Sequence, residues 1–433
     1  NTNKNGQDLA TGSGLRYSTD NGTSWHTVAQ PVDQPGDSSV VYGINTLRAL
    51  PVTVEINNIT YDIAFTKNTV WIASFAGGLR KSTNMGQTWE RVILPPDYLS
   101  SIKPTDQLNF ALQPVSGAFG NENYLNHRLF SVTSSNDSTL YVGTANGINK
   151  STDNGISWVK FNHTNQDKPI CGNFVVALHT IPNTDRVISA SWKAEDLSEY
   201  YGVSISEDGG NSWSNYLEGE KAHNFGHIYN PGDFAVNEDD IFAATNNGIF
   251  RTGNIGKSWI TPPSIYDKNL DFSLPANETE YYSVNVSKTG TFNYIWVGTS
   301  SGLAKLKELG SDWKGDWKIY LASQPLKSKD ETYAFPNPFS PDAEVCKIKF
   351  NINSTSDDIT IRIMDFGMNL VRTVLQNAPY SIAGDNIAVW DGRDENGKIV
   401  PNGVYFYRID KGDNDPIFGK IIVLMWLGGN FEI

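Results

Sequence analysis

The segment GLRYSTDNGTSW, from Gly14 to Trp25, recurs along the chain in an unchanged register. Every copy fits the pattern Gly-x-x-x-(Ser/Thr)-x-(Asp/Asn)-x-Gly-x-x-Trp, and the copies span Gly14–Trp25, Gly78–Trp89, Gly147–Trp158, Gly202–Trp213, Gly248–Trp259 and Gly302–Trp313. The last copy keeps the two glycines and the tryptophan, but Leu306 replaces the hydroxyl residue and Glu308 replaces Asp or Asn. A fixed spacing repeated in this way predicts a fold built from internal repeats.

The residues of this segment predict a tight β-hairpin. Ser, Thr, Asp and Asn side chains bond nearby backbone groups, and the glycine supplies the positive φ that closes a turn. The tryptophan falls on the returning strand, where its ring can pack across its own turn. A short β-rich run precedes the segment in several copies, at residues 69–74, 139–144, 240–245 and 294–299. With one further candidate strand before that run, each unit is predicted to be a four-stranded meander.

Four-stranded meanders repeated in this way are typical of a β-propeller. The repeat resembles the Asp-box (BNR) repeat of sialidases, sortilin-type receptors, xyloglucan hydrolases and a plant photosystem assembly factor, and it covers residues 8–322. The predicted fold is all-β, with six or seven four-stranded blades in a domain at residues 1–322. Because few residues precede the first copy, we expect upstream sequence to supply an inner strand or a further blade.

A second, different domain is predicted after a polar linker at residues 323–332. Residues 333–433 contain six or seven short strands, which favours an immunoglobulin-like sandwich. The motifs PNPF at 336–339, IRIMDFG at 361–367 and WDGRDENG at 390–397 resemble the flagellar hook-cap-like immunoglobulin domain. The same pattern resembles the carboxy-terminal sorting domain of the type IX secretion system. That resemblance implies export across a bacterial outer membrane, with the type IX translocon as partner and a final location outside the cell or on its surface.

Composition excludes several classes of function. The 433 residues carry a net charge of −13, which argues against nucleic acid and anionic membranes as partners. Cys171 and Cys346 are the only cysteines, so they build neither a disulfide framework nor a cysteine-rich zinc site. Twelve Trp, 19 Tyr and 20 Phe indicate an aromatic β protein, and no apolar run reaches the length of a membrane helix.

No catalytic or metal-binding set stands out in the sequence. The repeated carboxylates Asp20, Asp153 and Asp208 occupy equivalent hairpins, so turn formation explains them. His223 and His227 have helical spacing, but the surrounding Gly and Asn-Pro-Gly signals oppose a helix, and no Glu follows the first His. We therefore predict no catalytic residue, no metal site and no cofactor.

Glycan chemistry could take two forms in such a fold. A sialidase needs an arginine clamp for a carboxylate, but Arg16 and Arg80 share one repeat position and are expected on outer strands. A glycan-active hydrolase that uses a carboxylate pair stays open as the alternative function. Its candidate acids lie outside the repeated hairpins, at Asp106, Glu122, Glu195, Asp196, Glu199, Glu218, Glu220 and Asp233.

One segment breaks the repeat and is the candidate contact site. The turn between the second and third strands is short in most units, whereas the fourth unit has the insertion WKAEDLSEYYG at residues 192–202. Aromatic and acidic residues there predict a contact with a partner, through Trp192, Glu195, Asp196, Tyr200 and Tyr201. The leading function is therefore a non-enzymatic binding or scaffold protein, whose propeller loops hold an extracellular protein or glycan.

Overall fold

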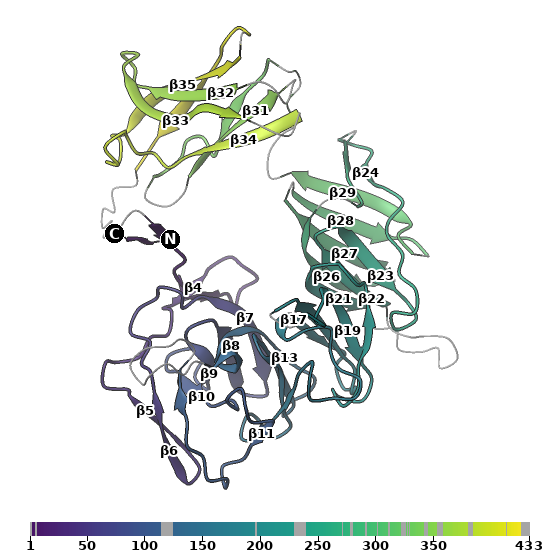
Figure 1. The fold of residues 1–433 in the computed structure, drawn as a ribbon. Coiled ribbons are helices and arrows are strands. Elements are labelled where there is room, and N and C mark those ends of the chain that lie inside the picture. Colours follow the sequence, from purple (N-terminus) through teal and green to yellow (C-terminus); the bar gives the residue numbers. More distant parts are fainter. Residues whose placement is uncertain are drawn as a thin grey trace. The chain divides into compact units, whose positions relative to one another are not determined.

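The computed structural model divides the chain into two compact units, residues 1–320 and 321–433, which Figure 1 draws as ribbons. It describes residues 2–4, 7–113, 124–194, 197–228, 240–270, 272–277, 280–290, 292–300, 302–310, 312–321, 326, 328, 330–341, 345–352, 358–379, 384–412 and 414–425. Several residues of the predicted linker lie outside this described part. None of the helices formed by these residues has the length and hydropathy that crossing a bilayer requires.

The N-terminal unit is a succession of antiparallel meanders whose strands neighbour each other in chain order. The first sheet contains β7 (Thr60–Thr66), β8 (Thr69–Ser74), β9 (Gly78–Ser82) and β10 (Glu90–Val92). The next contains β13 (Leu129–Ser134), β14 (Leu140–Thr144), β15 (Gly147–Ser151) and β16 (Trp158–Phe161), with β11 (Ser101–Ile102) at its edge. The third sheet contains β17 (Phe174–Thr180), β18 (Val187–Trp192), β19 (Gly202–Ser206) and β20 (Ser214–Tyr216). The fourth contains β21 (Ala222–Ile228), β22 (Asp240–Thr245) and β23 (Gly248–Thr252). The fifth contains β26 (Tyr281–Thr289), β27 (Phe292–Thr299), β28 (Gly302–Glu308) and β29 (Gly315–Leu321).

These meanders are the blades of a β-propeller. Their first strands, β7, β13, β17, β21 and β26, pack against one another in succession and are the inner strands. Second strands such as β14 are buried along their whole length, because a neighbouring blade covers each face. The prediction of an all-β propeller followed by an immunoglobulin-like sandwich is confirmed. The first repeated segment forms a two-stranded sheet, β3 (Leu15–Tyr17) with β4 (His26–Val28), which has no inner strand among the described residues.

The repeated segment forms the predicted hairpin between the third and fourth strands of a blade. Ser18 Oγ accepts the Gly22 N–H at 2.8 Å, and Asp20 Oδ1 accepts the Ser24 N–H at 2.8 Å. Trp25 Nε1 donates to the Gly22 carbonyl at 3.2 Å, so the indole does fold back across its own turn. The Ser24 hydrogen bonds lower the pKa of Asp20 to about 2, as expected for a carboxylate that holds backbone together.

The second glycine of the repeated segment is also required where the hairpin touches the neighbouring blade. A Cβ added to Gly155 would lie 2.7 Å from the Trp71 ring of the preceding blade, and one added to Gly210 would lie 2.6 Å from the Phe161 ring. Both glycines have a positive φ. The hairpin therefore needs glycine for its turn and for its close approach to the neighbouring blade.

The residue before this glycine gives a test of the turn. Its φ is positive in Asn21 (57°), Met85 (56°) and Asn154 (61°), and Asn tolerates this region better than Met. Met85→Asn is therefore expected to raise the free energy of unfolding by about 0.5–1 kcal/mol, because Met85 is exposed and little packing is lost. Urea denaturation measures the change. Asn154→Met is the matched reverse variant, and a gain in stability there would contradict the argument.

The long connections between the first blades form an accessory layer. β5 (Ser39–Tyr42) and β6 (Asn45–Ala49) make a hairpin, and β12 (Ala111–Leu112) pairs with β6 in parallel. Other connecting segments contain β1 (Thr2–Lys4), β2 (Gln7–Leu9), β24 (Ile265–Asp267), β25 (Phe272–Leu274) and the 3-10 helix η1 (Leu125–His127). Buried residues of this layer share a core with Trp71 of β8 and Leu79 of β9.

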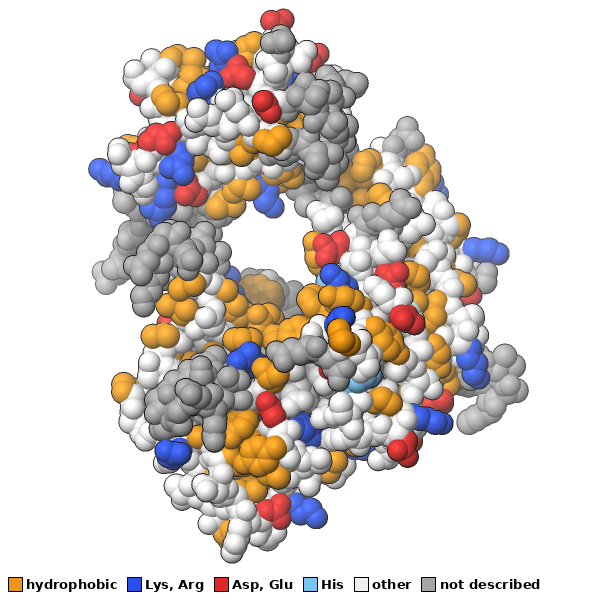
Figure 2. All heavy atoms as spheres, viewed as in Figure 1, with side chains coloured by type: hydrophobic (Ala, Val, Ile, Leu, Met, Phe, Trp, Pro, Cys, Tyr) orange, Lys and Arg blue, Asp and Glu red, His pale blue; other side chains and the backbone are white. Residues whose placement is uncertain are grey.

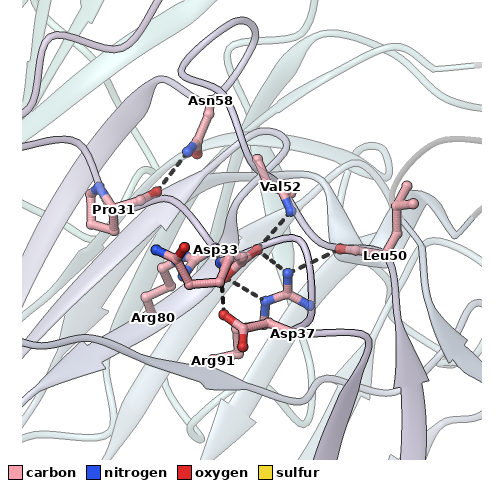
Figure 3. Close-up of polar contacts among 9 residues, drawn as sticks. Pro31, Asp33, Asp37, Leu50, Val52, Asn58, Arg80 and Arg91 are labelled. Carbon is pink, nitrogen blue, oxygen red and sulfur yellow. Dashed lines mark hydrogen bonds and ion pairs between the residues drawn. The ribbon is translucent and has the colours of Figure 1, made fainter.

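A buried ion cluster fastens this layer to the outer strands β9 and β10 (Figure 3). Arg80 Nη2 lies 2.8 Å from Asp33 Oδ1, and Arg91 Nε donates to the same oxygen at 3.0 Å. The Val52 N–H donates to Asp33 Oδ2 at 2.7 Å. Burial alone would raise the pKa of Asp33, but the Arg91 hydrogen bond and the Arg80 charge outweigh it and lower that pKa. Both arginines thus share one carboxylate as their contact partner.

The C-terminal unit is a sandwich of two antiparallel sheets. One contains β30 (Tyr333–Phe335), β31 (Cys346–Ile352) and β34 (Gly384–Trp390). The other contains β33 (Leu370–Pro379), β32 (Asp358–Met364), β35 (Gly403–Lys411) and β36 (Ile417–Val423). Every second residue of β35 points into the core, where Tyr407 and Trp390 are buried. Cys171 and Cys346 are buried thiols in different units and are not joined in a disulfide.

Candidate functional site

A β-bulge occurs near the start of all five inner strands. The pairing with the second strand slips by one residue at Tyr61, Phe130, Val176, His223 and Tyr282. A bulge leaves one residue out of the ladder and re-aims its side chain. The repeated slip therefore places one side chain per blade at the same end of the inner strands, beside the connections that join blades and those that join second to third strands.

Aromatic rings at this end form a continuous row across five blades. The ring centroids of neighbours lie 5.5 Å apart for Tyr61 and Phe130, 4.5 Å for Phe130 and Phe174, 6.1 Å for Phe174 and Trp192, 5.8 Å for Trp192 and His223, and 5.7 Å for His223 and Tyr282. We call these six residues the aromatic row. The planes are tilted or edge-to-face, which is the favourable geometry for aromatic contacts.

The row is open to solvent rather than part of the core. Tyr61 is 51% exposed and Tyr282 47% exposed, and the four rings between them are partly exposed. In Figure 2, hydrophobic side chains gather over the region where Figure 1 labels β7, β13 and β17. An accessible band of aromatic rings on a globular surface is a feature typical of a binding site.

One end of the row carries a carboxylate. Glu280 accepts a hydrogen bond from the Tyr282 hydroxyl at 2.7 Å, and its other oxygen lies 3.2 Å from His223 Nε2. The Tyr282 bond to Glu280 raises the pKa of that phenol. Burial lowers the pKa of His223 despite the nearby Glu280, so the imidazole is mostly neutral at pH 7. The Glu280 charge is therefore not cancelled by a full positive charge on His223.

Polar side chains next to the bulges form hydrogen bonds between the inner strands of neighbouring blades. Asp62 Oδ2 accepts the Val132 N–H of the next blade at 2.9 Å, and Asn224 Oδ1 accepts the Val284 N–H at 3.0 Å. Burial raises the pKa of Asp62 to about 6. Because these bonds join backbone to side chain across blades, they set the spacing of the rings beside them.

The structure separates the five residues predicted as a contact site. Trp192, at the end of β18, belongs to the aromatic row. The Tyr200 ring lies over Gly202 of β19, and the Tyr201 ring lies 4.8 Å from Lys221 Nζ, so neither joins the row. Glu195 and Asp196 lie outside the described residues.

Three of the acids considered for a carboxylate pair accept hydrogen bonds from other groups of the protein. Asp106 accepts the Lys103 N–H, and buried Glu199 accepts bonds from Asn173 and Ala194. Glu220 lies within hydrogen-bond distance of Thr245 and Asn247. Glu122 and Asp233 lie outside the described residues. The acid that the row does carry, Glu280, was not among the candidates.

The two histidines with helical spacing do not share a site. His223 contacts Glu280, whereas His227 Nδ1 lies 2.6 Å from Nε2 of His179 on β17. Within the described ranges, no group of three or more His, Cys, Asp or Glu side chains is arranged to hold a metal ion.

Sequence reasoning found Trp192 and missed the rest of the row. Its members come from six strands and share no motif, and the bulge that aims four of them depends on pairing with the second strand. One signal was available: an aromatic or imidazole side chain stands at the second position of β7, β13, β21 and β26. Aligning the inner strands of the blades would have brought those positions into register.

Comparisons with known proteins bear mainly on the C-terminal unit. Among curated proteins, no relative of the chain is found. Solved structures to which the chain is similar include YCF48 bound to D1 peptide, which is 14% identical with a TM-score of 0.40 over 71% of this chain and 75% of that chain. An ancestral GH74 enzyme is 12% identical with a TM-score of 0.36, over 90% of this chain and 64% of that chain.

A GH74 xyloglucanase from Xanthomonas campestris is 12% identical with a TM-score of 0.42, over 72% of this chain and 43% of that chain. The chain thus spans less than two thirds of either GH74 enzyme, and likeness at this level assigns no activity. Residues 339–415 match the family model described as FlgD Ig-like domain, so the C-terminal sandwich contains a FlgD Ig-like domain.

Proposed function

We propose that this protein is a non-enzymatic binding or scaffold protein of the cell surface or extracellular medium, and that the aromatic row is its ligand-binding surface. The observation that carries the proposal is the repetition of the bulge, which presents a side chain at the same end of five inner strands. Packing of the blades against one another does not require large exposed rings at this end. The row is a surface band, which suits an extended ligand better than a small molecule.

The hydrogen bonds that Asp106, Glu199 and Glu220 accept within the protein leave binding as the better supported function. Hydrolysis of a glycosidic bond needs two carboxyl groups about 5–9.5 Å apart on either side of the bond. Glu280 is bonded to Tyr282 and approached by His223, which suits positioning of rings and ligand rather than proton transfer.

Co-purification from the native host tests the binding function. Chemically cross-linked wild-type protein should retain a specific macromolecule that the Trp192→Ala variant loses. Tyr320→Ala is the matched control, because Tyr320 is a 40% exposed aromatic residue on β29, away from the row. Equal recovery by both variants would exclude the row as the binding surface, and release of reducing sugars from polysaccharides would contradict a non-enzymatic role.

We further propose that the C-terminal domain directs export by the type IX route. The support is the FlgD Ig-like match at residues 339–415 together with the sequence resemblance to sorting domains. Deletion of residues 333–433 in the host is expected to leave the propeller inside the outer membrane. Fractionation with antibody against the propeller measures this, and undiminished secretion of the truncated chain would refute the sorting role.

A further inference from the structure

The chain covers many of its other surface rings with its own cations. Lysine ammonium groups lie over aromatic faces on β27 and at Tyr201, and such contacts are attractive because the ring face is electronegative. The closest pairs are Lys307 with Phe292 at 4.1 Å, Lys305 with Tyr294 at 4.3 Å and with Trp296 at 4.6 Å, and Lys221 with Tyr201 at 4.8 Å.

The rings of the aromatic row lack such a cover. Among the cation–π pairs made by described residues, none involves any of the six row rings. Arg128 lies over Phe75, a neighbour of the row, 5.8 Å from that ring's centroid. Among the described residues, the row is thus an extended set of aromatic faces with no cation of the chain lying over them.

Two polar groups of the row already form hydrogen bonds within the protein. Trp192 Nε1 donates to the Ala222 carbonyl at 3.3 Å, and the Tyr282 hydroxyl donates to Glu280. A neutral glycan needs hydrogen-bonding partners for its hydroxyl groups, and a polyproline segment is held by donors from the aromatic groove. The row instead presents ring faces together with one partly exposed carboxylate, Glu280, whose side chain is 42% exposed.

We propose that the aromatic row binds a basic polypeptide segment, whose Lys or Arg side chains stack on the rings and pair with Glu280. This inference rests on the proposed binding function and names its ligand. The net charge of −13 supports it, because a negative protein attracts a positive segment at long range. Several stacked cations in succession suit a polymer, since each contact alone is weak.

Titration of the purified chain with defined probes tests the ligand class. The probes are short oligo-lysine and oligo-arginine peptides, an oligo-glutamate peptide and a neutral β-linked glucose oligosaccharide, and calorimetry gives Kd at two salt concentrations. The basic peptides should bind, and Trp192→Ala or Tyr282→Ala should weaken them about tenfold. Glu280→Gln keeps every ring but removes the charge, and it should reduce both the affinity and its dependence on salt.

Controls separate the possible failures. Tyr320→Ala removes an aromatic side chain that Lys318 already covers, and it should leave the Kd unchanged. If the row variants lose the oligosaccharide but not the basic peptides, the ligand class is wrong while the binding function stands. If basic peptides bind wild type and all variants equally, general charge attraction explains them and the inference is overturned. If the row variants change the binding of no probe and lose no partner from the host, the row is not a binding surface and both proposals fall.

Discussion

Asp33→Ala is expected to destabilise the N-terminal unit by about 3–5 kcal/mol, because it removes the carboxylate that contacts buried Arg80 and partly buried Arg91. Arg80 and Arg91 stand directly opposite each other on β9 and β10, where like charges repel. Asp33 contacts both guanidinium groups and is 7% exposed (Figure 3). Urea unfolding followed by circular dichroism should show an earlier transition for the propeller and an unchanged one for the sandwich.

Two further variants distinguish a charge effect from general damage to the connection. Asp37→Ala removes an exposed carboxylate whose charge reaches Arg80 without contacting it, and it is expected to change the free energy of unfolding by no more than about 1 kcal/mol. Adding Arg80→Met to Asp33→Ala should restore part of the stability, because one unpaired buried charge is removed. A loss below about 1 kcal/mol for Asp33→Ala would show that water reaches the arginines and that the cluster is not sealed.

Acidification is expected to destabilise the propeller at pH values above those at which the carboxylates of the hairpins become protonated. Burial lowers the pKa of His127 to about 4, and burial followed by the His227 charge lowers that of His179 to about 3, from an ordinary value of 6.5. Both groups bind fewer protons in the folded state. Their stabilising contribution is complete above pH 6.5 and is lost as pH falls toward 4 and 3, at about 1.4 kcal/mol per pH unit for each group.

Asp62 opposes this trend but does not cancel it. Burial raises the pKa of Asp62 from 3.8 to about 6, so the folded state binds more protons, and Asp62 adds stability as pH falls from 6 to 3.8. One favourable carboxyl against two unfavourable imidazoles leaves a net loss of about 1.4 kcal/mol per pH unit between pH 6 and 4.

Unfolding measured at several pH values checks the balance. His179→Gln replaces one titrating ring by a neutral amide, and it should flatten the slope between pH 6.5 and 4 by about 1.4 kcal/mol per unit. Wild-type and variant curves that run parallel over this window would contradict the role of His179. Stability that rises in the wild type as pH falls would show that Asp62 dominates.

The sequence by itself determined the blade. Glycine, hydroxyl, carboxylate and tryptophan at fixed spacing form their hydrogen bonds within one hairpin, as Ser18, Asp20 and Trp25 do, so the information is local and readable. The sandwich motifs were equally local, and the match to a FlgD Ig-like domain at residues 339–415 agrees with them. Trp192 could be singled out because it interrupts the repeat.

Only the tertiary structure decided what surrounds Trp192. Phe174 and His223 reach it from different inner strands, and a one-residue bulge aims His223 at it. The neutralisation of Arg80 by Asp33 likewise joins residues far apart in the chain. Pairing register and contacts between blades are non-local, because a slip of one residue turns a side chain to the opposite face. A sequence therefore specifies these arrangements without displaying them in any single segment.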